Sequence, residues 1–87
     1  MIDRARAEIL VSDRARKLPL GHSLRVESYK RDRFLQVGRK EIDTFQVVQY
    51  GFDRAEHVSD AAGLKKLLKA LFKREFPRST KLRLTAT

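Results

Sequence analysis

The sequence predicts a small α+β domain, in which one long amphipathic helix packs on a mainly antiparallel sheet of three to four strands. Apolar residues between positions 60 and 76 recur at the spacing of one helix face. Strand-like composition or two-residue alternation marks four other segments, which are residues 23–29, 33–37, 44–52 and 81–85. A chain of 87 residues suffices for one domain with a thin core, so we expect residues 1–87 to form a single domain of element order (α)βββαβ.

The long helix is predicted from Asp60 to Phe76. Asp60, or Ser59 before it, is expected to cap the first turn, and Pro77 prevents the helix from continuing. Glu75 falls inside the apolar stripe, which predicts either that the last turn frays or that a cation from elsewhere pairs with it. The apolar stripe consists of Leu64, Leu67, Leu68, Leu71, Phe72 and Phe76.

The segment before the first strand is ambiguous. Residues 2–18 have helical apolar spacing with Asp3 as a plausible cap, whereas residues 8–12 also fit a short strand; we favour the helix. Pro19 and Gly21 then predict a break.

The strands are predicted from alternation and turn residues. Residues 23–29 should pair through a hairpin at 30–32 with a strand of residues 33–37 that ends at Gly38. In residues 44–52 the apolar phase changes, which predicts either a central strand with both faces partly covered or a bulge near Val47. Residues 51–60 are expected to be an acidic connector. Residues 81–85 form the last predicted strand, with Leu82 and Leu84 inward.

Net charge is the strongest global signal. The chain carries +9 with a pI near 10.5, and the cations gather in two segments: residues 21–40 carry six against two anions, and residues 61–87 carry eight against one. Such a domain is expected to attract polyanions, above all nucleic acid. There are no cysteines, no long apolar run and no signal-peptide pattern. We therefore expect a cytoplasmic protein without integral membrane association.

No pattern for catalysis or cofactor binding stands out. His22 and His57 lie far apart in the sequence, and the glycines are too scattered for a phosphate-binding loop. Asp53, Glu56 and Asp60 match no calcium-loop spacing. We expect a protein that is not an enzyme and that has no cofactor and no metal site.

Three basic groups are the candidate contacts to nucleic acid. In the first hairpin, Tyr29 and Phe34 bracket cations that touch phosphates while Tyr29 stacks on a base; the alternative is an ordinary polar turn in which Phe34 faces the core. The second group is a lysine row on the outer side of the long helix, and the third follows that helix. Taken singly, each also fits ordinary solvated surface. The candidate residues are Tyr29, Lys30, Arg31, Arg33, Lys65, Lys66, Lys69, Lys73, Arg78, Lys81 and Arg83.

One family comparison follows from these residues. The element order and the group Lys65-Lys66-x-x-Lys69 resemble a double-stranded-RNA-binding domain, whose second helix places a similar group on phosphates. The first hairpin is too short for that family, and the approach to the helix is acidic instead of rich in glycine and lysine. No family is therefore assigned.

The sequence thus predicts a small basic domain that binds RNA or DNA, mainly through the phosphate backbone and with weak sequence specificity. The alternative is a non-catalytic protein-interaction module that uses a sheet edge, for example residues 81–85, to bind an acidic partner or a second copy of itself. Binding of the basic helix to a membrane surface is a third possibility, but it requires the apolar face of the helix to leave the core.

Overall fold

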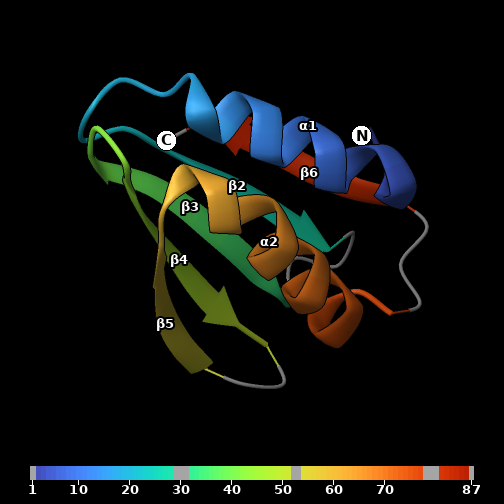
Figure 1. Cartoon of the computed structure of the whole chain (residues 1–87). Helices are drawn as coiled ribbons and strands as arrows, with labels where there is room; N and C mark the ends of the chain where they lie inside the picture. The colour runs from blue at the N-terminus through green and yellow to red at the C-terminus, as the bar shows by residue number, and fades with distance from the viewer. Residues whose placement is uncertain (1, 29–31, 52–53, 78–80, 87) are drawn as a thin grey trace.

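The computed structural model describes residues 2–28, 32–51, 54–77 and 81–86. The chain folds into two layers, a six-stranded antiparallel sheet and a pair of helices on one face of it (Figure 1). The strand order is β1-β6-β2-β3-β4-β5. In chain order the elements are β1 (Ile2–Asp3), α1 (Arg4–Arg16), β2 (Ser23–Ser28), β3 (Phe34–Glu41), β4 (Thr44–Tyr50), β5 (Arg54–Ser59), α2 (Ala61–Glu75) and β6 (Lys81–Ala86).

The predicted α+β class is confirmed, with more strands than expected. Besides the two-residue β1, the structure adds β5, which the sequence analysis took for an acidic connector. The residues of β5 that face the helices are Ala55, His57 and Ser59, so its inward positions are small or polar and the strand lacks an apolar alternation. The sequence pattern therefore did not predict β5, although this strand pairs along its whole length with β4.

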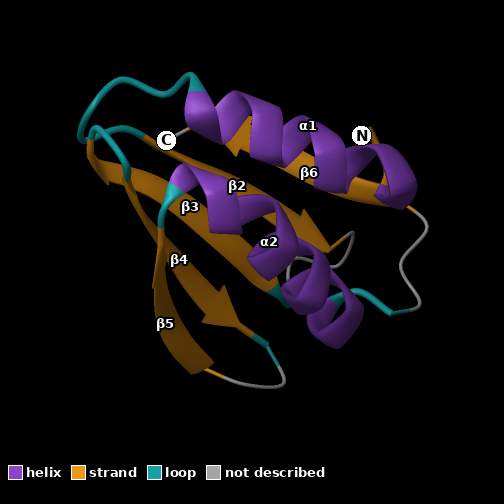
Figure 2. Ribbon diagram, viewed as in Figure 1, coloured by secondary structure: helices purple, strands orange, loops and turns teal. Residues whose placement is uncertain are grey.

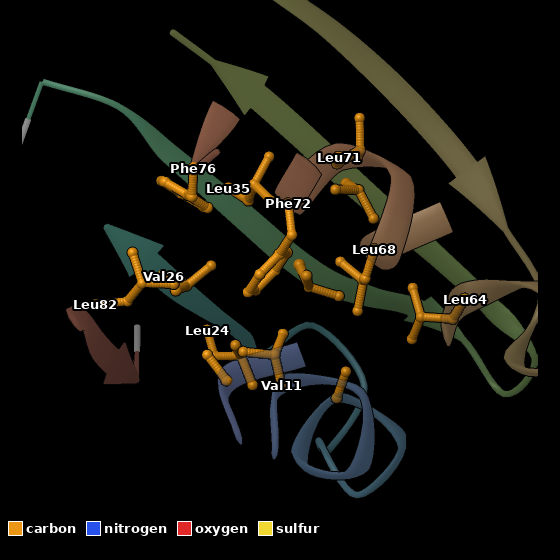
Figure 3. Close-up of a cluster of buried hydrophobic side chains, with 14 of the residues drawn as sticks. Val11, Leu24, Val26, Leu35, Leu64, Leu68, Leu71, Phe72, Phe76 and Leu82 are labelled. Atoms are coloured by element: carbon orange, nitrogen blue, oxygen red, sulfur yellow. The ribbon is translucent and has the colours of Figure 1, made fainter. Parts of the chain in front are cut away.

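The hydrophobic core lies between the helices and the sheet. α1 packs over β2, β3 and β6, and α2 packs over β4 and β5. In Figure 3 the side chains of α2 point toward those of the strands, and Val11 of α1 closes the cluster from its other side. The buried core residues are Ala7, Val11, Ala15, Leu24, Val26, Leu35, Val37, Phe45, Val47, Leu64, Leu68, Leu71, Phe72, Phe76 and Leu82.

Both central strands differ in detail from the prediction. β3 does not end at Gly38 but continues to Glu41, with a register irregularity between Arg39 and Glu41. β4 is a central strand between β3 and β5, which was one of the two predicted alternatives. The other alternative, a bulge near Val47, is wrong because the pairing with β3 is regular there. The change of apolar phase arises because the buried position after Val47 is filled by Gln49, while Val48 lies on the opposite face.

α2 begins and ends close to the predicted positions. The carboxylate of Asp60 accepts a hydrogen bond from the Gly63 backbone N–H at 2.7 Å, which satisfies one of the orphan donors of the first turn. The helix continues through Glu75, so the predicted fraying is wrong. Glu75 is fully buried, and its Oε2 accepts a hydrogen bond from Gln49 Nε2 at 2.7 Å.

α1 confirms the helix that was favoured for the first segment, but it is not capped as expected. Asp3 occupies the N-cap position without a side-chain capping bond. Its carboxylate instead accepts a hydrogen bond from Lys81 Nζ at 2.7 Å, which links the start of α1 to β6. At the other end Arg39 Nη1 donates to the carbonyl oxygen of Arg16 at 3.2 Å, one of the carbonyls that the helix leaves unpaired, and to that of Leu18 just beyond the helix at 3.0 Å.

Candidate nucleic-acid interface

The second face of the sheet is not covered by either helix (Figure 2). Because side chains alternate along a strand, every second residue of each strand projects onto this open face. The buried residues of β2, β3 and β4 identify the helix-facing set, so their neighbours face outward. The open face includes Arg25, Glu27, Phe34, Gln36, Gln46, Val48, Tyr50, Arg54, Glu56, Val58 and Arg83.

Four of these side chains form a stack that crosses four strands, which we call the arginine–aromatic column: Arg25, Phe34, Tyr50 and Arg54. The guanidinium carbon of Arg25 lies 4.2 Å from the Phe34 ring centroid. The Phe34 and Tyr50 centroids are 5.0 Å apart with 15° between the ring planes. The guanidinium carbon of Arg54 lies 4.6 Å from the Tyr50 centroid on β4. The column thus has an aromatic centre and a cation at each end.

Strand register brings these residues together. Phe34 pairs with Tyr50 across β3 and β4, and Tyr50 pairs with Arg54 across β4 and β5. Directly opposed residues on one face have Cβ atoms about 5 Å apart, which suits stacked rings. Arg25 leans from β2 toward Phe34 and is held by Gln36, whose Oε1 accepts from Arg25 Nε at 3.1 Å and Nη2 at 2.8 Å.

The column orders two guanidinium groups on an otherwise open surface. Each aromatic ring has neighbours on both sides, so cation–π attraction and ring stacking hold both arginines in place. Arg54 also donates to the Tyr50 hydroxyl at 3.0 Å. Arg25 Nη1 has no partner among the described residues, and a planar guanidinium with spare donors suits a phosphate or the face of a base.

A shallow hollow of about 80 Å³ lies on the same face. Gly38 contributes no side chain there, which lowers the sheet surface between Ser23 and Gln46. Gln36 contacts both the column and the hollow: its Oε1 accepts from Arg25, and its Nε2 lies 3.5 Å from Ser23 Oγ. The open face therefore offers a polar depression next to two ordered cations.

The residues predicted from the sequence do not gather on this face. Tyr29, Lys30, Arg31 and Arg78 lie outside the described residues. Arg33 turns toward the helix side of the sheet, where its Nη1 donates to the backbone carbonyl oxygen of Glu75 at 3.2 Å. Arg33 thus contacts the end of α2.

The remaining predicted cations divide between the two sides of the molecule. The α2 lysines Lys65, Lys66, Lys69 and Lys73 are exposed on the side of the helix that faces away from the sheet. Arg83 lies on the open face opposite Glu27, and Lys81 binds Asp3. The hydrogen bond and charge of Lys81 hold the pKa of the Asp3 carboxyl below its ordinary value. Those predicted cations that the structure describes therefore lie on two sides of the molecule instead of one.

Sequence reasoning missed most of the column. It expected Phe34 either to bracket the hairpin or to face the core, and the second expectation is wrong because Phe34 projects from the open face. Arg25 and Tyr50 were assigned to strands without a role, and Arg54 was placed in a connector. The available signal was the pairing of outward aromatic residues on neighbouring strands, which needs the register.

Other kinds of site receive little support. Within residues 2–28, 32–51, 54–77 and 81–86, no group of three His, Cys, Asp or Glu side chains is placed to hold a metal ion. In the same residues no helix has the length and hydropathy needed to cross a bilayer. Comparison with protein-family models, curated protein sequences and solved structures finds no match.

Proposed function

We propose that this chain binds nucleic acid on the open face of its sheet, mainly through the phosphate backbone and with weak sequence specificity. The observation that carries the proposal is the arginine–aromatic column, in which Phe34 and Tyr50 order the guanidinium groups of Arg25 and Arg54. Ordered guanidinium groups bind phosphate oxygens through paired N–H donors. The net charge of +9 draws polyanions toward the domain.

Single strands suit this face better than duplexes. In a single strand the bases are free to turn outward and stack on aromatic side chains or guanidinium planes. Arg54 ends the column on the edge strand β5 and is exposed, and Tyr50 beside it is 37% exposed. A base can stack on Arg54 while phosphates farther along the same strand reach Arg25 and Arg83, which lie on the same face.

Weak sequence specificity follows from the kind of side chains present. A guanidinium plane accepts any base, because every base has a π face. Two amides, Gln36 and Gln46, line the hollow and offer donors and acceptors to a base edge, but Gln36 already holds Arg25 and Gln46 donates to Glu56 at 3.1 Å. Their engagement leaves little capacity for base readout.

Fluorescence anisotropy with a mixed-sequence single strand tests the proposal. RNA, DNA and a duplex of equal length are titrated with the protein between about 50 and 200 mM salt, where binding through several phosphates falls steeply. We expect single strands to bind more tightly than the duplex, with a steep dependence on salt. Arg54→Gln should weaken binding of the single strand by about tenfold, which corresponds to one lost stacking contact of 1–3 kcal/mol. Tyr50→Leu should have a similar effect, because it removes the ring and the hydroxyl that hold the Arg54 guanidinium in place.

The control is Arg6→Gln on α1, which removes the same charge as Arg54→Gln from the helix side of the molecule, where Arg6 is exposed. It should change the affinity far less than Arg54→Gln does. Equal losses in both variants would show that net charge alone drives binding. Unchanged affinity in Arg54→Gln and Tyr50→Leu would exclude the open face as the site.

A second candidate function is self-association through a sheet edge. β6 was the predicted edge; β1 pairs with it at Lys81 and Leu82 alone, so residues 83–86 pair only with β2. Among the described residues the long edge is β5, which pairs on one side only and leaves Val58 72% exposed. Sedimentation equilibrium at several concentrations and at high salt tests this idea. Dimers that persist at high salt and dissociate in Val58→Lys would support it, and a monomer at all concentrations would exclude it.

A further inference from the structure

The exposed side of α2 carries a row of cations that the column does not use. We call Lys65, Lys66, Lys69 and Lys73 the lysine row; on a regular helix their side chains fall within an arc of about 100°. All four are exposed. Glu75 is the one carboxylate of α2, and it is buried on the opposite side of the helix.

The lysine row is unpaired in the part of the chain that the structure describes, since none of the four lysines forms an ion pair there. Lys65 and Lys69 are one helical turn apart, as are Lys69 and Lys73, so the row repels itself. An ordinary solvated helix face mixes the two signs of charge. A concentrated row of ammonium groups instead provides a local site for a polyanion.

The position of the row separates it from the column. α2 lies on the helix-covered face of the sheet with its lysines turned outward, whereas Arg25 and Arg54 project from the other face. The molecule measures 33 × 23 × 21 Å, so the two surfaces are separated by the full thickness of the core and the sheet. A short nucleic-acid segment that lies on one surface does not reach the other.

We propose that the lysine row is a second nucleic-acid site, and that one chain bridges two nucleic-acid segments, one on each side of the sheet. The identity of the first segment rests on the proposed function of the open face. The second site recognises mainly phosphates, because the exposed residues of α2 are lysines, alanines and Arg74, with no aromatic residue on which a base stacks. The row rises about 12 Å from Lys65 to Lys73, long enough to follow several phosphates.

A two-strand capture experiment tests bridging with the full chain. One single-stranded DNA of about ten nucleotides, comparable to the site sizes of small single-strand-binding domains, is fixed to beads. A second, non-complementary strand of the same length carries a fluorophore. Protein is added below the amount of bead-bound strand, and the captured fluorescence reports bridging. Anisotropy with the free strand reports total binding, and in a variant without the lysine row it reports binding to the first site alone.

Two charge-matched variants identify the surface responsible. The first replaces the lysine row, as Lys65→Gln, Lys66→Gln, Lys69→Gln and Lys73→Gln. The second removes the same charge from exposed positions in and just after α1, as Arg6→Gln, Arg14→Gln, Arg16→Gln and Lys17→Gln. We expect the first variant to lose bridging by at least about tenfold while its first-site affinity stays within a few-fold, and to lose about three units of salt slope in the bridged complex. The second variant should still bridge.

The outcomes separate this inference from the proposed function. Bridging that persists in the lysine-row variant overturns the inference, and this result is also expected if a dimer with two open faces does the bridging. Equal loss in both charge-matched variants overturns it as well, since net charge would then explain the effect. If the lysine-row variant loses all binding while Arg54→Gln loses none, the lysine row is the sole site and the proposed role of the open face fails.

Discussion

At Glu75 the helical wheel places a carboxylate among apolar side chains. The sequence predicted fraying or a cation from elsewhere, and the structure shows an intact helix with Arg33 donating to the Glu75 carbonyl oxygen. The carboxylate itself accepts from Gln49, which requires the Gln49 amide nitrogen to face Glu75 and its Oε1 to face His57 Nε2 at 2.9 Å. His57 Nε2 is therefore the donor in that hydrogen bond. No sequence pattern predicted the hydrogen bonds among Glu75, Gln49 and His57, because these residues lie on three different elements, α2, β4 and β5.

The same corner makes Gly51 sensitive to substitution. A Cβ added there would overlap Glu75 Oε1 and lie 3.0 Å from Arg33 Cγ, and the buried carboxylate is held by Gln49. We expect Gly51→Ala to lower the free energy of unfolding by about 1–3 kcal/mol, as overpacking does.

Gly38→Ala is the matched control, since its Cβ would meet Ser23 Cβ at an ordinary 3.5 Å. It should stabilise β3 by about 0.5 kcal/mol in urea denaturation. Equal stability of the two variants would contradict the predicted overlap.

Asp3 gives a prediction about pH. Lys81 donates a hydrogen bond to the Asp3 carboxylate and lowers the pKa of that carboxyl. The contact therefore stabilises the fold at pH values above the ordinary aspartate pKa, and this stabilisation is lost as the pH falls through the lowered pKa. An NMR titration of the Asp3 carboxyl should show a pKa below the ordinary value in the native protein. In Lys81→Gln the pKa should return toward that value. A pKa unaffected by the substitution would show that the Lys81 contact does not form in solution.

At the scale of elements, prediction succeeded where burial is one-sided and apolar. α2 and the alternation of β2 were evident because each buries apolar side chains at the period of its backbone. β5 was missed because its inward residues are small or polar, and the length of β3 was missed because Gly38 looked like a stop. A glycine in a strand interrupts the apolar alternation of the sequence but not the pairing of the strands. Gly38 still pairs with Gln46, and Arg39 after it pairs with Phe45.

The N-terminus of α2 depends on two carboxylates. Asp60 Oδ1 accepts from the Gly63 N–H at 2.7 Å, and Asp43 Oδ1, from the turn between β3 and β4, accepts from the Ala61 N–H at 3.0 Å. We expect Asp60→Ala to lower the free energy of unfolding by about 1 kcal/mol, the usual effect of losing a cap. Asp13→Ala, at an exposed position of α1, should change it by less than about 0.5 kcal/mol. An unchanged urea midpoint for Asp60→Ala would refute the capping role.

The lysine row should lower the stability of the helix that carries it. Lys69 lies one turn from Lys65, Lys66 and Lys73, and like-charge pairs at this spacing each destabilise a helix by about 0.2–0.5 kcal/mol. We therefore expect Lys69→Gln to raise the free energy of unfolding by roughly 1 kcal/mol at low salt. The gain should vanish near 1 M salt, where the screening length is about 3 Å. Stability that is unchanged at low salt would mean that the lysines splay apart and do not form a concentrated field.

For the whole molecule, the sequence predicted the layers and the sign of the charge but not how the sheet divides the charged groups. Composition gives a net charge of +9 but does not say on which side of the sheet the cations lie. The column depends on the register of β2, β3, β4 and β5, and register follows from long-range pairing. Consequently the helix lysines could be proposed from periodicity alone, whereas Arg25 and Arg54 became candidates only once the strands were aligned around Phe34 and Tyr50.

Two surfaces on opposite sides of one core should act independently. The smallest dimension of the molecule is 21 Å, well beyond the screening length of about 8 Å at physiological salt, so charge bound on one side barely affects the other. NMR titration with a strand of about ten nucleotides should therefore first shift amides around Arg25, Tyr50 and Arg54, because stacking on Arg54 adds to phosphate binding there. Amides of α2 should shift only when the strand is in excess.

The same titration of Arg54→Gln separates the two surfaces. It should weaken the first set of shifts and leave the apparent affinity of the α2 set unchanged, since interactions more than about 10 Å apart add without coupling. Lys69→Gln should do the reverse. If both sets move together at every ratio of strand to protein, a single strand contacts both sides at once, and the two surfaces form one continuous path around the edge of the sheet.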